Sequence, residues 1–389
     1  MSDRHLPVRP NLDQLKHQAK DLLRDMKRER SDTKLADAQF ALARSYGVAS
    51  WPRLVLACRI VDAIWRDDVD AVRALVVKHP NLLHEMARGT KSCNWGPPMS
   101  YAANLGRDRI IATLSELGAT DLTRAMDRAV LQGRIETARQ LSAMGARPER
   151  GCVMGPCETQ NGEGLAYLIE LGAELCDHLG DRSAPLAMLL GTYCRNSQGK
   201  HECLELLATH GVALADTPTM AVHRGRIDLL ERHLRTDPDL VHRTFSLKEI
   251  YPEGGNHDAN GNELGIHGTP LEGTTLLHLC VDQDEPEVLQ WLLDHGADAN
   301  VKASVDADGF GGHTPLFGCV ITAPGAHQDE RLARLLLDHG ADPNARASLR
   351  KDGFEYRDVT PLSWGERFHG RELASQAAMR LIAEHGGRP

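Results

Sequence analysis

The sequence has few aromatic residues, no long apolar run and no paired cysteines. Aromatic residues make up 4% of the 389 residues, whereas β-sandwiches are rich in aromatic and β-branched side chains. No apolar run approaches the roughly 20 residues that a membrane span needs, and the first residues lack an apolar stretch of the signal-peptide type. We therefore expect a soluble, cytoplasmic protein that does not bind to membranes.

The chain also lacks the common signatures of catalysis and of redox chemistry. Its 9 cysteines are an odd number without short paired spacings, so we expect no disulfide framework. There is no glycine-rich phosphate loop after a strand and no nucleophile elbow. An enzymatic activity is therefore not indicated, although it is not excluded, and we expect no cofactor.

Charge is spread unevenly along the chain. The net charge is −9, but residues 1–60 hold 12 Lys and Arg against 7 Asp and Glu, a net of +5. The remaining residues hold 33 against 47, a net of −14. An acidic body repels phosphate backbones, so nucleic acid is an unlikely partner, and only the basic first segment keeps that option open.

An internal repeat organises most of the chain. A helix ending with glycine recurs, and its glycines are Gly118, Gly145, Gly172, Gly211, Gly296, Gly340 and Gly386. The gap between Gly211 and Gly296 contains one more unit, and residues 71–83 form another. We count nine units between about residue 61 and the C-terminus.

Each unit reads as two short helices. The second helix has apolar residues at helical spacing and ends at a glycine that can adopt a left-handed conformation. Several first helices open with a proline. At the first position of a helix the backbone N–H has no partner within the helix, so a proline, which lacks this N–H, is well tolerated there. Neither helix can bury its apolar face alone, so stacking of neighbouring units must provide the core.

These units resemble ankyrin repeats. Residues 275–280, 314–319 and 360–365 resemble the ankyrin Thr-Pro-Leu-His-x-Ala opening, and residues 292–300 and 335–344 resemble the ankyrin second-helix ending. The spacing departs from the roughly 33 residues of the family. The resemblance implies an all-α solenoid, here an irregular array of the bacterial type with an N-terminal helical extension.

We predict two domains. Residues 1–60 form the N-terminal helical extension, with helices over 11–30 and 34–46, and this extension caps the first repeat. Residues 61–389 form the ankyrin repeat domain. Its insertions are expected near 88–98, 148–162, 243–273, 301–313 and 345–359.

Two of the insertions are copies of each other. Residues 300–304 align with 344–348, and the Asp-Gly-Phe sequence at 308–310 repeats at 352–354. Asp-Gly is a turn former, so the pattern predicts long β-hairpin fingers that lie side by side as a wall beside the concave helix face. We expect binding contacts from the fingers and the large insertion, at His257, His267, Lys302, Asp308, Phe310, Arg346, Asp352, Phe354 and Tyr356.

Two further turns suggest an alternative site. They combine Gly-Pro with aromatic, thiol and polar side chains, which can build a small pocket. The candidate pocket residues are Asn94, Trp95, Tyr101, Cys152, Cys157, Glu158 and Asn161. The simpler interpretation is that these side chains cover the core and set the turn.

Metal binding is not predicted. His257, Asp258 and His267 share one loop and are the candidates for zinc, but they do not complete a ligand set. The same loop departs from a calcium loop, because Glu263 stands where a glycine is needed.

We therefore expect a scaffold that binds a protein partner through its concave face and its finger loops. The alternative is a small-molecule or enzymatic pocket built on that face by the inserted loops.

Overall fold

The computed structural model describes most of the chain as helices. The described residues are 4–90, 94–252, 268–321 and 329–389. They form two compact units, residues 1–149 and residues 150–389, which we call unit 1 and unit 2 and describe separately. Among the described residues, no helix is both long enough and apolar enough to cross a bilayer.

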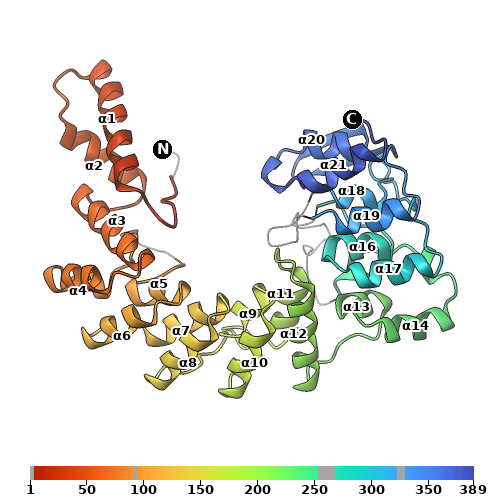
Figure 1. Ribbon diagram of the computed structural model, residues 1–389, viewed down its shortest axis with the longest axis horizontal. Helices are drawn as coiled ribbons and strands as arrows, with labels where there is room; N and C mark the ends of the chain where they lie inside the picture. Colours follow the sequence, from red (N-terminus) through yellow and green to blue (C-terminus); the bar gives the residue numbers. More distant parts are fainter. Residues whose placement is uncertain (1–3, 91–93, 253–267, 322–328) are drawn as a thin grey trace. The chain divides into compact units, whose positions relative to one another are not determined.

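Unit 1 consists of eight α-helices and one short 3-10 helix in its described part (Figure 1). The two expected N-terminal helices are present, and Asn11 caps the first of them by accepting two backbone N–H groups. The elements are α1 (Leu12–Glu29), α2 (Leu35–Ser45), α3 (Trp51–Trp65), α4 (Val69–Lys78), η1 (Pro80–Leu83), α5 (Pro98–Asn104), α6 (Asp108–Glu116), α7 (Leu122–Leu131) and α8 (Ile135–Ala143).

The N-terminal extension shares a hydrophobic core with α3. Leu15 and Ala19 of α1 and Leu42 of α2 are buried together with Leu54 and Cys58 of α3. The helix α3 is the first helix of the first repeat pair, so residue 60, where we predicted a domain boundary, lies inside a continuous helix. The division of the chain into an extension and a repeat domain stays a prediction.

Unit 2 contains the other thirteen α-helices of the described residues and most of the predicted insertions. Its first helices are α9 (Met154–Glu158), α10 (Gly162–Glu170), α11 (Ala184–Gly191), α12 (Ser197–Thr209), α13 (Pro218–His223), α14 (Ile227–Thr236), η2 (Leu240–His242) and α15 (Leu247–Ile250). The remaining elements are α16 (Leu276–Gln283), α17 (Pro286–Asp294), α18 (Pro315–Gly318), α19 (Arg331–Asp338), β1 (Ala347–Lys351), β2 (Phe354–Val359), α20 (Pro361–Arg367), η3 (Arg371–Leu373) and α21 (Gln376–Glu384).

The described residues contain the nine helix pairs that the repeat predicted, from α3/α4 to α20/α21. In unit 1, α5 packs against α7 and α4 against α6; in unit 2, α16 packs against α18 and α17 against α19. First helices thus stack on first helices, and second helices on second helices, which is the architecture of an all-α solenoid.

The glycines that end the second helices have the backbone conformation that we predicted. Their φ angles lie between +81° and +110°, where a side chain would be strained. At Gly118, for example, the chain turns so that Ala119 N–H reaches back to the carbonyl oxygen of Leu114. The glycines of this set are Gly118, Gly145, Gly172, Gly211, Gly296, Gly340 and Gly386.

One segment that we expected to be an inserted loop contains a helix. Residues 154–158, within the insertion predicted at 148–162, form α9, the first helix of the fourth pair. Gly155 and Pro156 indicated a turn, but proline is tolerated in the first turn of a helix, where its missing N–H is not needed.

The finger at 345–359 is a β-hairpin, as predicted. Strands β1 and β2 pair antiparallel and are joined at Asp352 and Gly353, whose φ angles are +52° and +81°. Positive φ at both central residues is the geometry that Asp-Gly favours in a two-residue hairpin. The finger at 301–313 is different, because it is a loop whose own two sides are joined by an isolated bridge between Val305 and Gly311.

Candidate functional site

The inserted segments of unit 2 lie side by side and are joined by backbone hydrogen bonds. Ser304 N–H donates to the carbonyl oxygen of Gly273 at 2.9 Å, at the end of the large insertion. Gly311 N–H donates to the carbonyl oxygen of Ser348 at 2.6 Å, and Ser348 N–H donates back at 3.3 Å. Residues 301–313 and 345–359 therefore form one continuous surface, which we call the finger surface.

Side chains reinforce the link between the two fingers. Phe310 is only 5% exposed, because the guanidinium groups of Arg350 and Arg357 both lie 4.2 Å from its ring centre. Arg350 also forms ion pairs with Asp306 at 3.0 Å and with Asp308 at 2.8 Å. Phe310, which we predicted to contact a partner, is thus buried between the fingers and holds them together.

Phe354 is the exposed aromatic side chain of the finger surface. It is 52% exposed, and its ring stacks on the imidazole of His369 with 4.6 Å between ring centres. His369 is itself fixed by Tyr356, whose hydroxyl lies 3.0 Å from Nδ1, and by Asp352, which lies 3.2 Å from Nε2. Tyr356 is buried, so among these predicted contacts it supports Phe354 rather than facing solvent.

The other predicted binding residues of the fingers are exposed and charged. Lys302 and Asp308 are exposed on the first finger, and Arg346 is exposed on the second, where it pairs with Asp358 at 2.8 Å. Val305 is an exposed apolar side chain beside them in the sequence. The finger surface therefore presents two exposed apolar side chains, Phe354 and Val305, among charged ones.

The remaining predicted contacts lie in the large insertion. His257 and His267, and with them the zinc candidate Asp258, lie outside the described residues. Elsewhere in the described ranges, no group of three or more His, Cys, Asp and Glu side chains could hold a metal ion.

The predicted pocket residues of unit 1 are part of its packing. Tyr101 is fully buried, and its hydroxyl donates to the carbonyl oxygen of Val8 and accepts from Trp65 Nε1 at 3.4 Å. Trp95 lies against Tyr101 with 4.7 Å between ring centres. Asn94 is exposed. Two of the three candidates thus cover the core.

The other four predicted pocket residues belong to unit 2, where they are buried or form hydrogen bonds within the unit. Cys157 is fully buried, and burial raises the pKa of its thiol well above its ordinary value. Cys152 is buried as well, while Asn161 caps α10 by accepting Gly164 N–H at 3.0 Å. Glu158 accepts a hydrogen bond from Tyr193 at 3.2 Å. These side chains are thus engaged within the described part of unit 2, and a pocket that combines all seven residues stays a prediction.

A buried network of charged residues in unit 2 was missed by the sequence analysis. Lys200 Nζ lies 2.8 Å from Glu285 Oε1, and both side chains are 1% exposed. His201 Nε2 lies 2.9 Å from the same carboxylate. A second buried pair joins Arg195 to Asp282 at 3.0 Å. Two cations and two anions are thus removed from water together, which is tolerable only because they are paired.

Gln283 joins these pairs to the start of the large insertion. Its Oε1 accepts from Lys200 Nζ at 3.1 Å, and its Nε2 donates to Tyr251 Oη at 3.1 Å. Tyr251 is fully buried at the end of α15, next to the buried ring of His223. Burial and the nearby charge of Lys200 lower the pKa of His223 to about 3. The network therefore anchors one end of the large insertion.

The turn of the α16/α17 pair differs in sequence from the turns of other pairs, and this difference falls at the buried network. Three other pairs have Gly-Arg at the turn between their helices, with the glycine at positive φ: Gly106-Arg107, Gly133-Arg134 and Gly225-Arg226. The α16/α17 turn has Asp284-Glu285 instead, and Asp284 adopts the left-handed conformation at φ +56°. The reversal of charge from arginine to Glu285 marks the position that binds Lys200.

Comparisons with known proteins agree with the repeat. Residues 197–347 match the family model for ankyrin repeats (3 copies). Among solved structures, the crystal structure of the human ASB11 ankyrin repeat domain matches with 17% identity and a TM-score of 0.28, over 75% of this chain and 99% of that one. At that TM-score, the structural match adds nothing to the family match. No curated protein matches the chain.

Proposed function

Residues 197–347 match ankyrin repeats, and from that premise we propose that the chain is an ankyrin repeat scaffold that recognises a protein partner through its finger surface and its concave helix face. Ankyrin repeats generally mediate contacts between proteins. The observation that carries the proposal is the exposed ring of Phe354, which is held on His369 in a surface that also carries charged side chains.

The chemistry of the finger surface suits a protein partner. Binding energy at protein interfaces is concentrated in a few aromatic and arginine side chains surrounded by polar contacts. Phe354 is the aromatic anchor, Val305 adds apolar area, and Arg346 and Lys302 are exposed charged side chains of the same fingers.

The surface is also ordered before any partner arrives. The backbone hydrogen bonds between the fingers and the stacking of Phe310 between two arginines fix their positions. Preorganisation reduces the entropy that association must otherwise cost. Such a surface can bind with little rearrangement.

The charge of unit 2 indicates the kind of partner. Residues 150–389 contain 21 Lys and Arg and 36 Asp and Glu, a net of −15. We propose a partner with a basic or neutral surface, steered by charge, so that association slows as salt is added. A cytoplasmic location is part of the same proposal.

A capture experiment with matched variants tests the proposal. The full-length protein is immobilised, and the proteins that it retains are compared with those retained by Phe354→Ala and by Phe40→Ala. Phe40 is the control because it is equally exposed, at 56%, but lies on α2 of unit 1. We expect a retained protein to be lost with Phe354→Ala, by about tenfold or more, and kept with Phe40→Ala.

Two results contradict the proposal. One is equal retention by all three proteins, and the other is loss with Phe40→Ala alone. Both variants remove an exposed ring, so circular dichroism is expected to show the same helix content for all three.

A further inference from the structure

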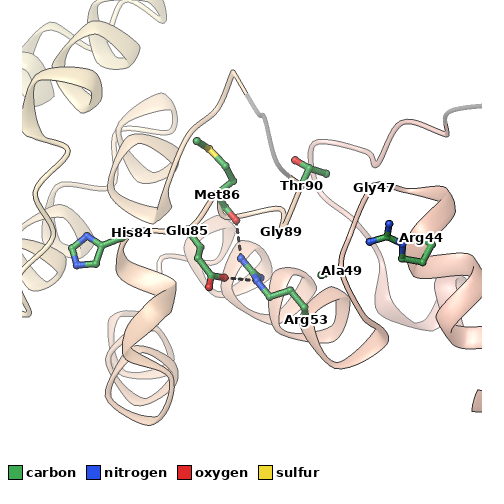
Figure 2. Close-up of a pocket in the computed structure, with 9 residues that line it drawn as sticks. All are labelled: Arg44, Gly47, Ala49, Arg53, His84, Glu85, Met86, Gly89 and Thr90. Atoms are coloured by element: carbon green, nitrogen blue, oxygen red, sulfur yellow. Dashed lines mark hydrogen bonds and ion pairs between the residues drawn. The ribbon is translucent and has the colours of Figure 1, made fainter.

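Unit 1 contains a cavity that the proposed function does not use. It has a volume of 540 Å³, within the range of small-molecule sites. Three segments line it: the end of α2 with the loop that follows, the first turn of α3, and the chain after η1. Its lining residues include Arg44, Ala49, Arg53, Glu85 and Gly89 (Figure 2).

Arg53 is held in a fixed orientation at the wall of this cavity. Its Nε donates to Glu85 Oε2 at 2.6 Å, and its Nη2 donates to the carbonyl oxygen of Met86 at 2.8 Å. Its Nη1 is buried and has no hydrogen-bond partner among the described residues. The N–H groups of Nη1 therefore have no acceptor within the described part of the chain.

Gly89 allows the chain to pass close to that guanidinium. Its φ is +74°, and a Cβ built there would lie 3.2 Å from Arg53 Nη1. Any larger residue would therefore be strained and would press on the arginine. The cavity wall is thus adapted to the guanidinium group.

Arg44 provides a second cation from another element. Its guanidinium extends from α2 toward the side where Ala49 and Arg53 lie, whereas the imidazole of His84 points away from Arg53 (Figure 2). The Arg44 side chain makes no ion pair or hydrogen bond with the residues that the structure describes. Since α2 ends and α3 begins at the same loop, their helix dipoles offset each other, and the positive potential comes from the arginines.

From these observations we infer that the cavity binds a small molecule carrying a phosphate or carboxylate group. The planar fork of arginine matches both groups, and two arginines against the single carboxylate of Glu85 leave a net positive charge. The surroundings have the same sign, because unit 1 has 24 Lys and Arg and 18 Asp and Glu, a net of +6.

Calorimetric titration of the full-length protein tests this inference. The probes are pyrophosphate for the phosphate class and citrate for the carboxylate class, each at constant ionic strength. We expect saturable binding of at least one probe with one site per chain, and the tighter probe identifies the class. Arg44→Gln is expected to weaken binding by about tenfold, because one charge-assisted contact is lost. Glu85→Gln is expected to tighten it several-fold, because a competing anion is removed.

Two matched variants control for a general effect of charge. Arg59→Gln removes an exposed arginine from the same helix as Arg53, and Glu116→Gln removes a carboxylate that also pairs with an arginine, Arg73, in unit 1. Both are expected to leave the affinity unchanged. The inference is overturned if neither probe saturates by ~10 mM, or if the control variants change binding as much as Arg44→Gln and Glu85→Gln do.

Discussion

The two units consist of the same kind of helix pairs but differ in net charge and in the burial of the ion pairs between their helices. Unit 1 has a net charge of +6, and its Arg73–Glu116 ion pair leaves the two side chains 45% and 64% exposed. Unit 2 has a net charge of −15, and its Lys200–Glu285 pair is 1% exposed on both sides. A pair in water contributes little to stability, whereas removing one member of a buried pair leaves the other charge buried and unpaired, which is costly.

Two of the turns between paired helices, one in each unit, illustrate this difference. In unit 1 the turn arginine Arg107 donates to the carbonyl oxygen of Trp65 at 2.8 Å, which is a local contact between neighbouring pairs. In unit 2 the corresponding residue, Glu285, binds Lys200 from α12. One change of charge thus converts a turn position into part of a network that anchors an insertion.

Breaking the buried pair is expected to have the largest effect. Glu285→Ala leaves Lys200 charged and buried without its carboxylate, which we expect to cost about 3–5 kcal/mol of unfolding free energy. Glu116→Ala, which breaks the exposed pair of unit 1, is expected to cost about 0–1 kcal/mol. Urea unfolding measures both, and hydrogen exchange of α12 and α16 locates the loss.

A double variant provides the control for this comparison. Lys200→Met combined with Glu285→Leu removes both charges, so it is expected to be more stable than Glu285→Ala alone. Equal costs for Glu285→Ala and Glu116→Ala would show that burial of the pair does not matter.

Truncation of Phe310 is expected to lower stability, whereas truncation of Phe354 is expected to change stability little and to affect binding. Phe310→Ala empties the space between Arg350 and Arg357 and is expected to cost about 3 kcal/mol, as for other buried aromatic rings. Phe354→Ala removes a half-exposed ring and is expected to cost less than about 1 kcal/mol. Thermal unfolding of both variants checks this difference. Similar midpoints would mean that Phe310 does not hold the fingers together.

Acid is expected to weaken unit 2 and not unit 1. Burial lowers the pKa of His223 to about 3, of His278 to about 4 and of His313 to about 3. The unfolded chain binds protons at these histidines below about pH 6.5 while the folded chain does not, so stability falls as the pH drops, by about 1 kcal/mol per histidine at pH 5.5. In unit 1, burial and the charge of Glu149 raise the pKa of Asp127 to about 6. That carboxyl group binds its proton more readily when folded, so it favours folding as the pH falls.

Hydrogen exchange at pH 7.5 and pH 5.5, corrected for the intrinsic exchange rate, compares the two units in one sample. We expect protection of α16 to decrease at the lower pH, while protection of α7 is kept. A parallel loss in both units would contradict the assignment of the effect to the buried histidines.

The sequence predicted what depends on local chemistry. The left-handed glycines, the prolines that open helices and the Asp-Gly turn of the second finger each follow from the residue itself, and the nine helix pairs follow from their recurrence. The helix α9 was missed because its Gly155-Pro156 pair is also typical of a turn.

What the sequence did not predict depends on distant partners. Lys200 and Glu285 are 85 residues apart, and Phe310 is buried only because Arg350 and Arg357 approach it from the other finger. No periodicity marks such pairs. The sequence shows that Asp284-Glu285 replaces Gly-Arg at this turn. Only the structure shows that Glu285 pairs with Lys200.

Photo-crosslinking from the two exposed phenylalanine positions tests the central claim most directly. A benzoylphenylalanine is placed at position 354 or at position 40 of the full-length protein, and each protein is irradiated in the same cell extract. We expect a discrete cross-linked product with a second protein from position 354 and none from position 40. A product from position 40 alone, or the same products from both positions, would contradict recognition by the finger surface.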